Sequence, residues 1–238
     1  ADVVLVDGSY DEASRLSFTA SEEFGWYNRN TGYNPYTVEG KKTAGFEIWE
    51  QVLRFLPSEE QLTVFISVGD GNILSGIAKG FVDLLALGWI ERLPRLIGVQ
   101  AEGSAAVYNA FTNNTDIIEA VHARTIADSI SVDLPADGYR ALKRVRESNG
   151  FFLTVSDDEI LAAIPTMGSA GLFVEPAAAT AYAGLVNASN NGLVDPDSKV
   201  LVMATGSGLK DIKAAMSAVP SAPVIEPTLS DLKEVLHV

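Results

Sequence analysis

Short apolar runs that alternate with amphipathic segments constrain the fold of this chain more than any other feature. The clearest run, Thr63–Val68, is rich in β-branched residues and ends at Gly69, which is typical of a buried strand. Amphipathic spacing follows from Ile73 to Leu87, and Gly88 is suited to end that helix. Strands that alternate with helices predict an α/β fold, with an open, mostly parallel sheet covered by helices on both faces.

The same alternation covers most of the chain. The expected strands are Asp2–Val6, Thr63–Val68, Arg95–Gln100, Phe151–Val155 and Lys199–Ala204. The expected helices are Tyr10–Phe24, Gly40–Leu56, Ile73–Leu87, Tyr139–Glu147, Glu175–Asn187 and Thr228–Leu236. One more helix should begin at the capping box Ser156–Glu159.

Composition excludes several classes of function. The 238 residues include no cysteine, so disulfides, Cys-ligated zinc and thiol nucleophiles are ruled out. Only His122 and His237 are present, and their distance in sequence argues against a histidine metal site and against a Ser-His-Asp triad. A formal net charge of −14 argues against a nucleic-acid partner, because such partners need a basic face.

The most apolar stretch runs from Ile160 to Val186 and contains one charged residue, Glu175. A membrane-spanning helix needs ~20 apolar residues without a break. Two prolines and two glycines interrupt this stretch: Pro165, Gly168, Gly171 and Pro176. We therefore expect a buried helix-strand-helix segment, no membrane partner and, since no secretory signal is present, a cytoplasmic protein.

Two glycine-containing loops follow expected strands. Gly69-Asp-Gly-Asn72 precedes a helix, whose free amides and positive dipole end favour a phosphate. Its spacing matches neither a Walker A loop nor a full dinucleotide fingerprint, and Asp70 would have to point away from a phosphate. Thr205-Gly-Ser-Gly208 follows the last strand, so the two loops can flank one crevice at the carboxyl edge of the sheet. Ordinary tight turns are the alternative for both loops.

Six segments in order resemble threonine synthase and its relatives, the β-family or fold-type II of pyridoxal phosphate enzymes. They are Asp7–Ala13, Asn34–Thr43, Ser67–Gly76, Pro94–Glu102, Phe173–Ala177 and Thr205–Asp211. The resemblance runs from Ala1 to about Met216. It implies that residues 1–32 end a small domain, that residues 33–238 form a large cofactor-binding domain, and that the enzyme is a homodimer.

The resemblance assigns pyridoxal 5'-phosphate to the two loops. Gly69, Asp70, Gly71 and Asn72 would hold its phosphate, mainly through backbone amides, and Thr205 would give its hydroxyl to the pyridine nitrogen. The implied reaction is elimination or replacement at the β or γ carbon of an amino acid. In threonine synthase this is the conversion of phosphohomoserine to threonine.

The lysine that carries the cofactor in this family has no counterpart here. The family's Ser-Phe-Lys-Asp-like motif lies upstream of the segment that matches Ala1, and Ser17-Phe-Thr19 lacks the lysine. We therefore expect the Schiff-base lysine upstream of Ala1, in a missing N-terminal segment, and no catalytic residue in this chain. The chain then resembles the C-terminal two-thirds of an enzyme and is inactive alone. The alternatives are a non-catalytic cofactor-binding subunit and a flavodoxin-like phosphate-ligand module.

The expected substrate contacts also depart from the family. Members that use phosphohomoserine carry an Asn-Ser pair before the Asn-Pro motif and an arginine after it. Around Asn34 those places hold Thr31, Gly32 and Thr37. Losing the arginine weakens phosphate recognition, which leaves open a dehydratase, an ammonia-lyase such as one acting on diaminopropionate, or a β-replacement synthase. An alignment slip of a residue or two is the alternative.

Four other polar residues are candidates for a role. Glu39 and Glu102 flank the expected crevice and could be acid or base groups, but such residues more often fix loops or form ion pairs. Glu175 should cap the helix after it through its carboxylate, because an unpaired buried carboxylate would be costly. Ser129 matches a family motif, and a capping role explains it as well.

Overall fold

Four parallel strands form a sheet in the order β3-β2-β1-β4 within residues 2–57 and 59–237, which the computed structural model describes. The strands are β1 (Thr63–Ser67), β2 (Arg95–Ala101), β3 (Phe151–Val155) and β4 (Val200–Val202). The helices are α1 (Tyr10–Phe24), α2 (Pro35–Lys41), α3 (Thr43–Gln51), α4 (Asn72–Ala86), α5 (Ala106–Thr112), α6 (Gly138–Glu147), α7 (Asp157–Ser169), α8 (Pro176–Asn190), α9 (Ile212–Ser217) and α10 (Leu229–Leu236). Short 3-10 turns are η1 (Leu53–Phe55), η2 (Glu102–Ser104), η3 (Asp128–Ile130) and η4 (Gly208–Lys210).

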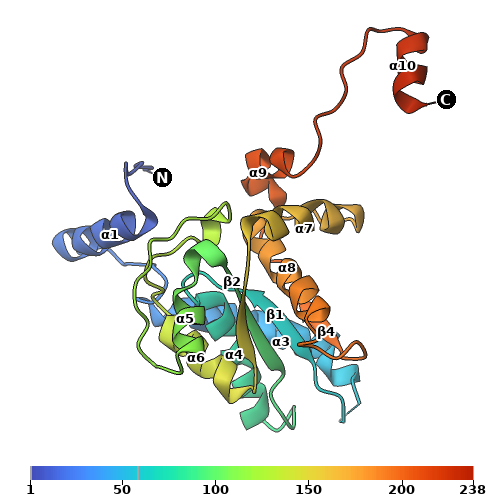
Figure 1. Ribbon diagram of the computed structural model, residues 1–238. Coiled ribbons are helices and arrows are strands. Elements are labelled where there is room, and N and C mark those ends of the chain that lie inside the picture. The colour runs from blue at the N-terminus through green and yellow to red at the C-terminus, as the bar shows by residue number, and fades with distance from the viewer. Residues whose placement is uncertain (1, 58, 238) are drawn as a thin grey trace.

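Helices cover both faces of the sheet, as predicted for an α/β fold, although the edge strand β4 is only partly buried. Every residue of β1 is buried, and its side chains alternate between two cores. Val64 and Ile66 pack with α4 and α6, whereas Phe65 packs with α7 and α8. Figure 1 shows α8 across one face and α4 with α6 across the other. This double cover explains why the strand sequences are continuous apolar runs.

The expected strand Asp2–Val6 is wrong. These residues form no strand, and Val3, Val4 and Leu5 are 82–92% exposed. A strand is stable only beside a partner that completes its hydrogen bonds, and none lies next to this segment in the described part of the chain. The following helix α1 has no buried residue and stands away from the sheet (Figure 1).

The apolar stretch around Pro165 also differs from the prediction. Pro165 lies inside α7, and the expected intervening strand is reduced to a single bridge between Val174 and Ser207. A proline inside a helix costs about 3 kcal/mol, but the buried face of α7, with Ile160 and Ile164, packs against α8 and offsets that loss. The capping box Ser156–Glu159 is confirmed as the start of α7.

Two further boundaries differ from the expected ones. The expected helix Gly40–Leu56 is divided at Lys42 into α2 and α3, and β4 is shorter than the predicted Lys199–Ala204. In the described residues, no helix is both long and apolar enough to cross a membrane.

Four charged side chains join α2 to α4. The Lys42 Nζ atom lies 2.6 Å from Glu39 and 3.1 Å from Asp83, and Lys79 also bonds to Asp83. The hydrogen bond from Lys42 holds the pKa of Glu39 below its usual value, and the same bond raises the pKa of Lys42. Burial raises the pKa of Asp83, but hydrogen bonds from Lys79 and Lys42 outweigh it and keep that pKa low. Glu39 therefore fixes helices, as favoured from the sequence.

This cluster should make stability depend on acid pH. A carboxylate with a lowered folded-state pKa stabilises the fold above its ordinary pKa of about 4, and that contribution is lost as the pH falls through the folded value. We expect the urea midpoint of unfolding to decrease between about pH 5 and pH 3, and Asp83→Asn to reduce this decrease. Glu50→Gln, at an exposed position of α3, is the control. An identical decrease in the Asp83→Asn variant would contradict the prediction.

Candidate functional site

The loop Gly69–Asn72 connects the end of β1 to the first turn of α4. Gly71 has a φ of 87° and precedes the helix directly. The first amides of a helix have no partner within it, and here one of them is already engaged, because the amide of Asn72 donates to Asp70 Oδ1 at 2.9 Å. The Asp70 carboxylate is therefore folded back onto the loop, which leaves the other first-turn amides of α4 for a ligand.

Thr205 lies at the same edge of the sheet as this loop. β1 and β4 pair in parallel, with Phe65 opposite Val202, and the amide of Met203 donates to the carbonyl of Phe65 at 3.0 Å. Thr205 is three residues beyond Val202, as Val68 is three residues beyond Phe65. The pairing therefore carries Thr205, which is exposed, to the level at which the Gly69 loop begins.

The segment between η3 and α6 supports the loop closely. A Cβ atom at Gly69 would lie 2.8 Å from Ile130 Cα, and one at Gly71 would lie 2.9 Å from the carbonyl oxygen of Asp137. The amide of Asp137 donates to the carbonyl of Asp70 at 2.8 Å. The two glycines are therefore required for this backbone approach, besides any role toward a ligand.

Asn72 and Ser75 place buried polar atoms beneath the loop. Both are fully buried. The side-chain nitrogen of Asn72, Nδ2, donates to Thr37 Oγ1 at 3.3 Å and to the carboxylate of Asp137. Asn72 Oδ1 and Ser75 Oγ have no hydrogen-bond partner in the part of the protein that the structure describes. Buried polar atoms without a hydrogen-bond partner are rare in folded proteins, so these two atoms are candidates for contact with a ligand.

Thr37 and Asn34 lie at the start of α2, and Thr37 touches the loop. The Thr37 hydroxyl donates to the carbonyl of Asn34 at 2.7 Å and accepts from Asn72. Asn34 is the N-cap of α2: its Oδ1 accepts from the amide of Tyr36 at 3.0 Å, and its Nδ2 donates to the carbonyl of Asn28 at 2.9 Å. Thr37 is thus joined to the candidate site, whereas the polar atoms of Asn34 are engaged locally.

Thr31 and Gly32 lie on the side of the loop that faces α1. Thr31 and Asp70 both line a cavity of about 470 Å³ between α1 and the segment 132–139. Gly32 has a φ of 72°, and a Cβ there would lie 2.3 Å from Ala136 Cβ. Gly32 therefore permits a close chain crossing.

Glu175 does not cap α8 with its side chain, so that expectation is wrong. The residue occupies the N-cap position, but its side chain makes no capping hydrogen bond. Instead, its carboxylate accepts from Lys210 Nζ at 2.9 Å and from the Ser129 hydroxyl at 3.1 Å, and the residue is only 5% exposed. A lysine reaching this buried carboxylate from the Thr205 loop satisfies the charge better than helix amides alone.

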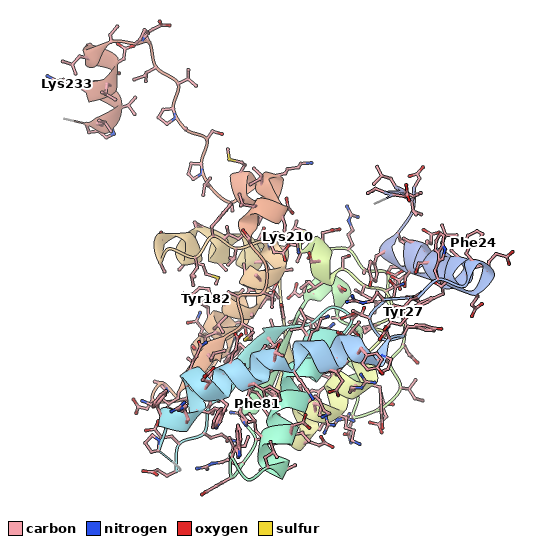
Figure 2. All side chains as sticks on the ribbon, turned by 180° about the vertical axis from the view of Figure 1, so that it is seen from behind. Phe24, Tyr27, Phe81, Tyr182, Lys210 and Lys233 are labelled. Atoms are coloured by element: carbon pink, nitrogen blue, oxygen red, sulfur yellow. The ribbon has the colours of Figure 1, made fainter. Side chains whose placement is uncertain are left out.

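Three lysines near the site are engaged in ion pairs. Lys42 and Lys79 belong to the cluster on α2 and α4, and Lys210 bonds to Glu175. Lys210 lies between α9 and the N-terminal end of α8 (Figure 2). Over residues 2–57 and 59–237, no group of three or more histidine, aspartate or glutamate side chains could hold a metal ion.

Comparisons with known proteins agree with the family resemblance. A family model described as pyridoxal-phosphate dependent enzyme matches residues 1–206. Threonine synthase of Methanocaldococcus jannaschii is 34% identical over 238 residues, which cover 99% of this chain and 58% of that protein. Threonine synthase of Mycobacterium tuberculosis (strain H37Rv) is 36% identical over 223 residues, covering 93% and 58%.

The fold is also found among solved structures. The processed form of threonine deaminase isoform 2 from Solanum lycopersicum superposes with a TM-score of 0.73 at 24% identity, over 91% of this chain and 59% of that one. The chain thus spans about 58% of the length of the curated relatives it matches.

Proposed function

Because the chain belongs to the family of pyridoxal-phosphate dependent enzymes, we propose that it binds pyridoxal phosphate between the loops Gly69–Asn72 and Thr205–Gly208. The observation that carries this proposal is the pairing of β1 with β4, which brings both loops to one edge of the sheet. The Ser75 hydroxyl, which has no hydrogen-bond partner among the described residues, supports it further, because a hydroxyl in the first turns of a helix can donate to a phosphate oxygen.

Each loop would hold a different part of the cofactor. Backbone amides of Gly69, Asp70 and Gly71 would bind the phosphate together with the first-turn amides of α4 that follow Asn72. The Asn72 amide is held by the Asp70 carboxylate, which is folded back onto the loop and would stay away from the phosphate. The Thr205 hydroxyl would hold the pyridine nitrogen. Because a hydroxyl is uncharged, it does not force a proton onto that nitrogen. Bound pyridoxal phosphate supplies an electron sink for amino-acid chemistry.

We propose that this chemistry is a threonine synthase-like elimination or replacement in a longer, homodimeric enzyme, with residues 1–32 ending a small domain and residues 33–238 forming the large one. Phosphohomoserine is the leading substrate, since the relatives above are named threonine synthase. Thr37 favours a second candidate, a serine or threonine dehydratase or a diaminopropionate ammonia-lyase. Its hydroxyl is bonded to Asn34 and Asn72, and it offers a substrate phosphate no positive charge.

A substrate panel separates the two candidates. The enzyme that contains this chain is supplied with phosphohomoserine, serine, threonine and diaminopropionate in turn. Phosphate release from phosphohomoserine supports the threonine synthase assignment and shows the weight placed on Thr37 to be mistaken. Ammonia release from one of the other three supports the second candidate.

The chain itself should bind the cofactor without covalent attachment. We expect saturable binding of pyridoxal phosphate in equilibrium dialysis and none of pyridoxal, which lacks the phosphate. Borohydride reduction followed by mass spectrometry should leave no stoichiometric adduct on one lysine, because Lys42, Lys79 and Lys210 are held in ion pairs. A single specific adduct would overturn the view that the attachment lysine is not among these residues.

A further inference from the structure

We propose that Glu175 is a positioning residue that ties the Thr205 loop to the support of the Gly69 loop, so that both keep one spacing. The proposal rests on the cofactor-binding function proposed above. Glu175 is a buried carboxylate at the start of α8, and it contacts two segments that are distant in sequence, one at Ser129 and one from Gly206 to Lys210.

The first set of contacts fixes the Thr205 loop. Lys210 Nζ donates to Glu175 Oε1 at 2.9 Å, and the amide of Glu175 donates to the carbonyl of Gly206 at 3.1 Å. A Cβ at Gly206 would lie only 1.9 Å from Glu175 Oε1. The carboxylate therefore rests directly on the backbone next to Thr205, and any shift of Glu175 moves that backbone or is opposed by it.

The second set of contacts leads to the Gly69 loop. Ser129 Oγ donates to Glu175 Oε2 at 3.1 Å, and Lys210 Nζ lies 3.3 Å from the same hydroxyl. Ile130, the neighbour of Ser129, lies so close to Gly69 that a Cβ atom added at Gly69 would be 2.8 Å from Ile130 Cα. A continuous line of contacts thus runs from Lys210 through Glu175 and η3 to Gly69, where the phosphate would bind.

The two residues of the ion pair differ in exposure, so losing one does not have the same consequence as losing the other. The side chain of Lys210 is 58% exposed and that of Glu175 is 7% exposed. Without Glu175, the lysine can turn to water, whereas without Lys210 a buried carboxylate is left unpaired, which is strongly unfavourable. The bridge between Val174 and Ser207 remains in either case, with its two backbone hydrogen bonds, from Gly208 to Phe173 at 3.0 Å and from Glu175 to Gly206 at 3.1 Å. Glu175→Gln should therefore leave the chain folded.

Amide hydrogen exchange of the chain, followed by mass spectrometry, tests this role. In Glu175→Gln, peptides covering residues 126–131 and 205–211 should both exchange about tenfold faster, while peptides of β1 and α4 keep their rates. Lys210→Met, which leaves the buried Glu175 carboxylate without its cation, should speed exchange in the same two segments by at least as much. Lys210→Arg should preserve the wild-type rates. The matched control is Lys213→Met, at an exposed lysine of α9.

Equilibrium dialysis with pyridoxal phosphate distinguishes this proposal from the one it rests on. If Glu175→Gln speeds exchange in only one of the two segments, or in neither, the positioning role is overturned even if the chain binds the cofactor. If both segments respond but wild type does not bind pyridoxal phosphate, the cofactor assignment fails and the coupling of the loops stands. With both correct, Glu175→Gln also weakens pyridoxal phosphate binding by about tenfold.

Discussion

Replacing Gly71 by alanine is expected to weaken pyridoxal phosphate binding about a hundredfold. Each tenfold change in the dissociation constant corresponds to about 1.4 kcal/mol of binding free energy. Gly71 has a φ of 87°, a backbone conformation that costs alanine about 1–2 kcal/mol. The added Cβ would also lie 2.9 Å from the carbonyl oxygen of Asp137 and 3.0 Å from Ala141 Cβ. The loop must therefore move, and the first-turn amides of α4 move with it. Equilibrium dialysis measures the loss directly.

Gly88→Ala is a matched control for this variant. Gly88 also has a positive φ, 70°, but it follows the other end of α4, and a Cβ there would have nothing within 4 Å. Its replacement brings the same kind of backbone strain without disturbing the loop. Gly88→Ala should lower the melting temperature and leave the dissociation constant unchanged. Wild-type affinity in Gly71→Ala would refute the assignment of this loop to the phosphate.

Phe81→Ala is expected to destabilise the chain by about 3–5 kcal/mol, because it leaves a cavity in a core that cannot close fully. Phe81 is 1% exposed on α4, in the cluster that contains Ile48 of α3 and Val64 of β1. Figure 2 shows its position where α4 passes the long helical segment of α2 and α3. Urea unfolding followed by circular dichroism gives the change in the free energy of unfolding.

Phe55→Ala provides the comparison at the surface. Phe55 is 70% exposed, and the guanidinium carbon of Arg54 lies 4.9 Å from the centroid of its ring. Losing an exposed cation–π contact costs about 0.5–1 kcal/mol. Should Phe81→Ala itself fail to fold, Phe81→Leu, which removes less volume, still gives a measurable change. Equal effects at Phe81 and Phe55 would contradict the core described for α4.

Periodicity and capping predicted most elements of the sheet layer, because β1, β3 and their helices carry their signals locally. The misses have non-local causes. Asp2–Val6 has the composition of a strand, but a strand depends on a neighbour that its own sequence does not specify. Pro165 indicates a break, yet packing of α7 on α8 overrides it. The division at Lys42 follows the close packing of α2 and α3 on α4, where a Cβ at Gly80 would lie 2.5 Å from the carbonyl of Lys42.

The candidate site, like the fold, could be predicted from the sequence only where its signals are local. Two loops that each follow a strand could be expected at one edge of the sheet, because parallel strands end on the same side. The partners of Glu175 could not be derived from spacing, since Ser129 and Lys210 lie 46 and 35 residues away. The bond between Asn72 and Asp137 spans 65 residues. The only sequence signal for these contacts is that Glu175 is a lone carboxylate in an apolar stretch and needs a partner.

The strand order has a consequence for assembly kinetics. β1 is the first strand of the sheet in sequence, whereas its neighbour β4 comes from one of the last segments of the chain. The two strands pair only over a short stretch, Thr63–Phe65 with Val200–Val202. Pairings so distant in sequence close late during folding, because the loop entropy must be overcome first. A ligand that touches both the Gly69 and Thr205 loops therefore acts as a chain-closing clamp: it binds only when β4 has docked, and its binding free energy is added to the stability of that docked state.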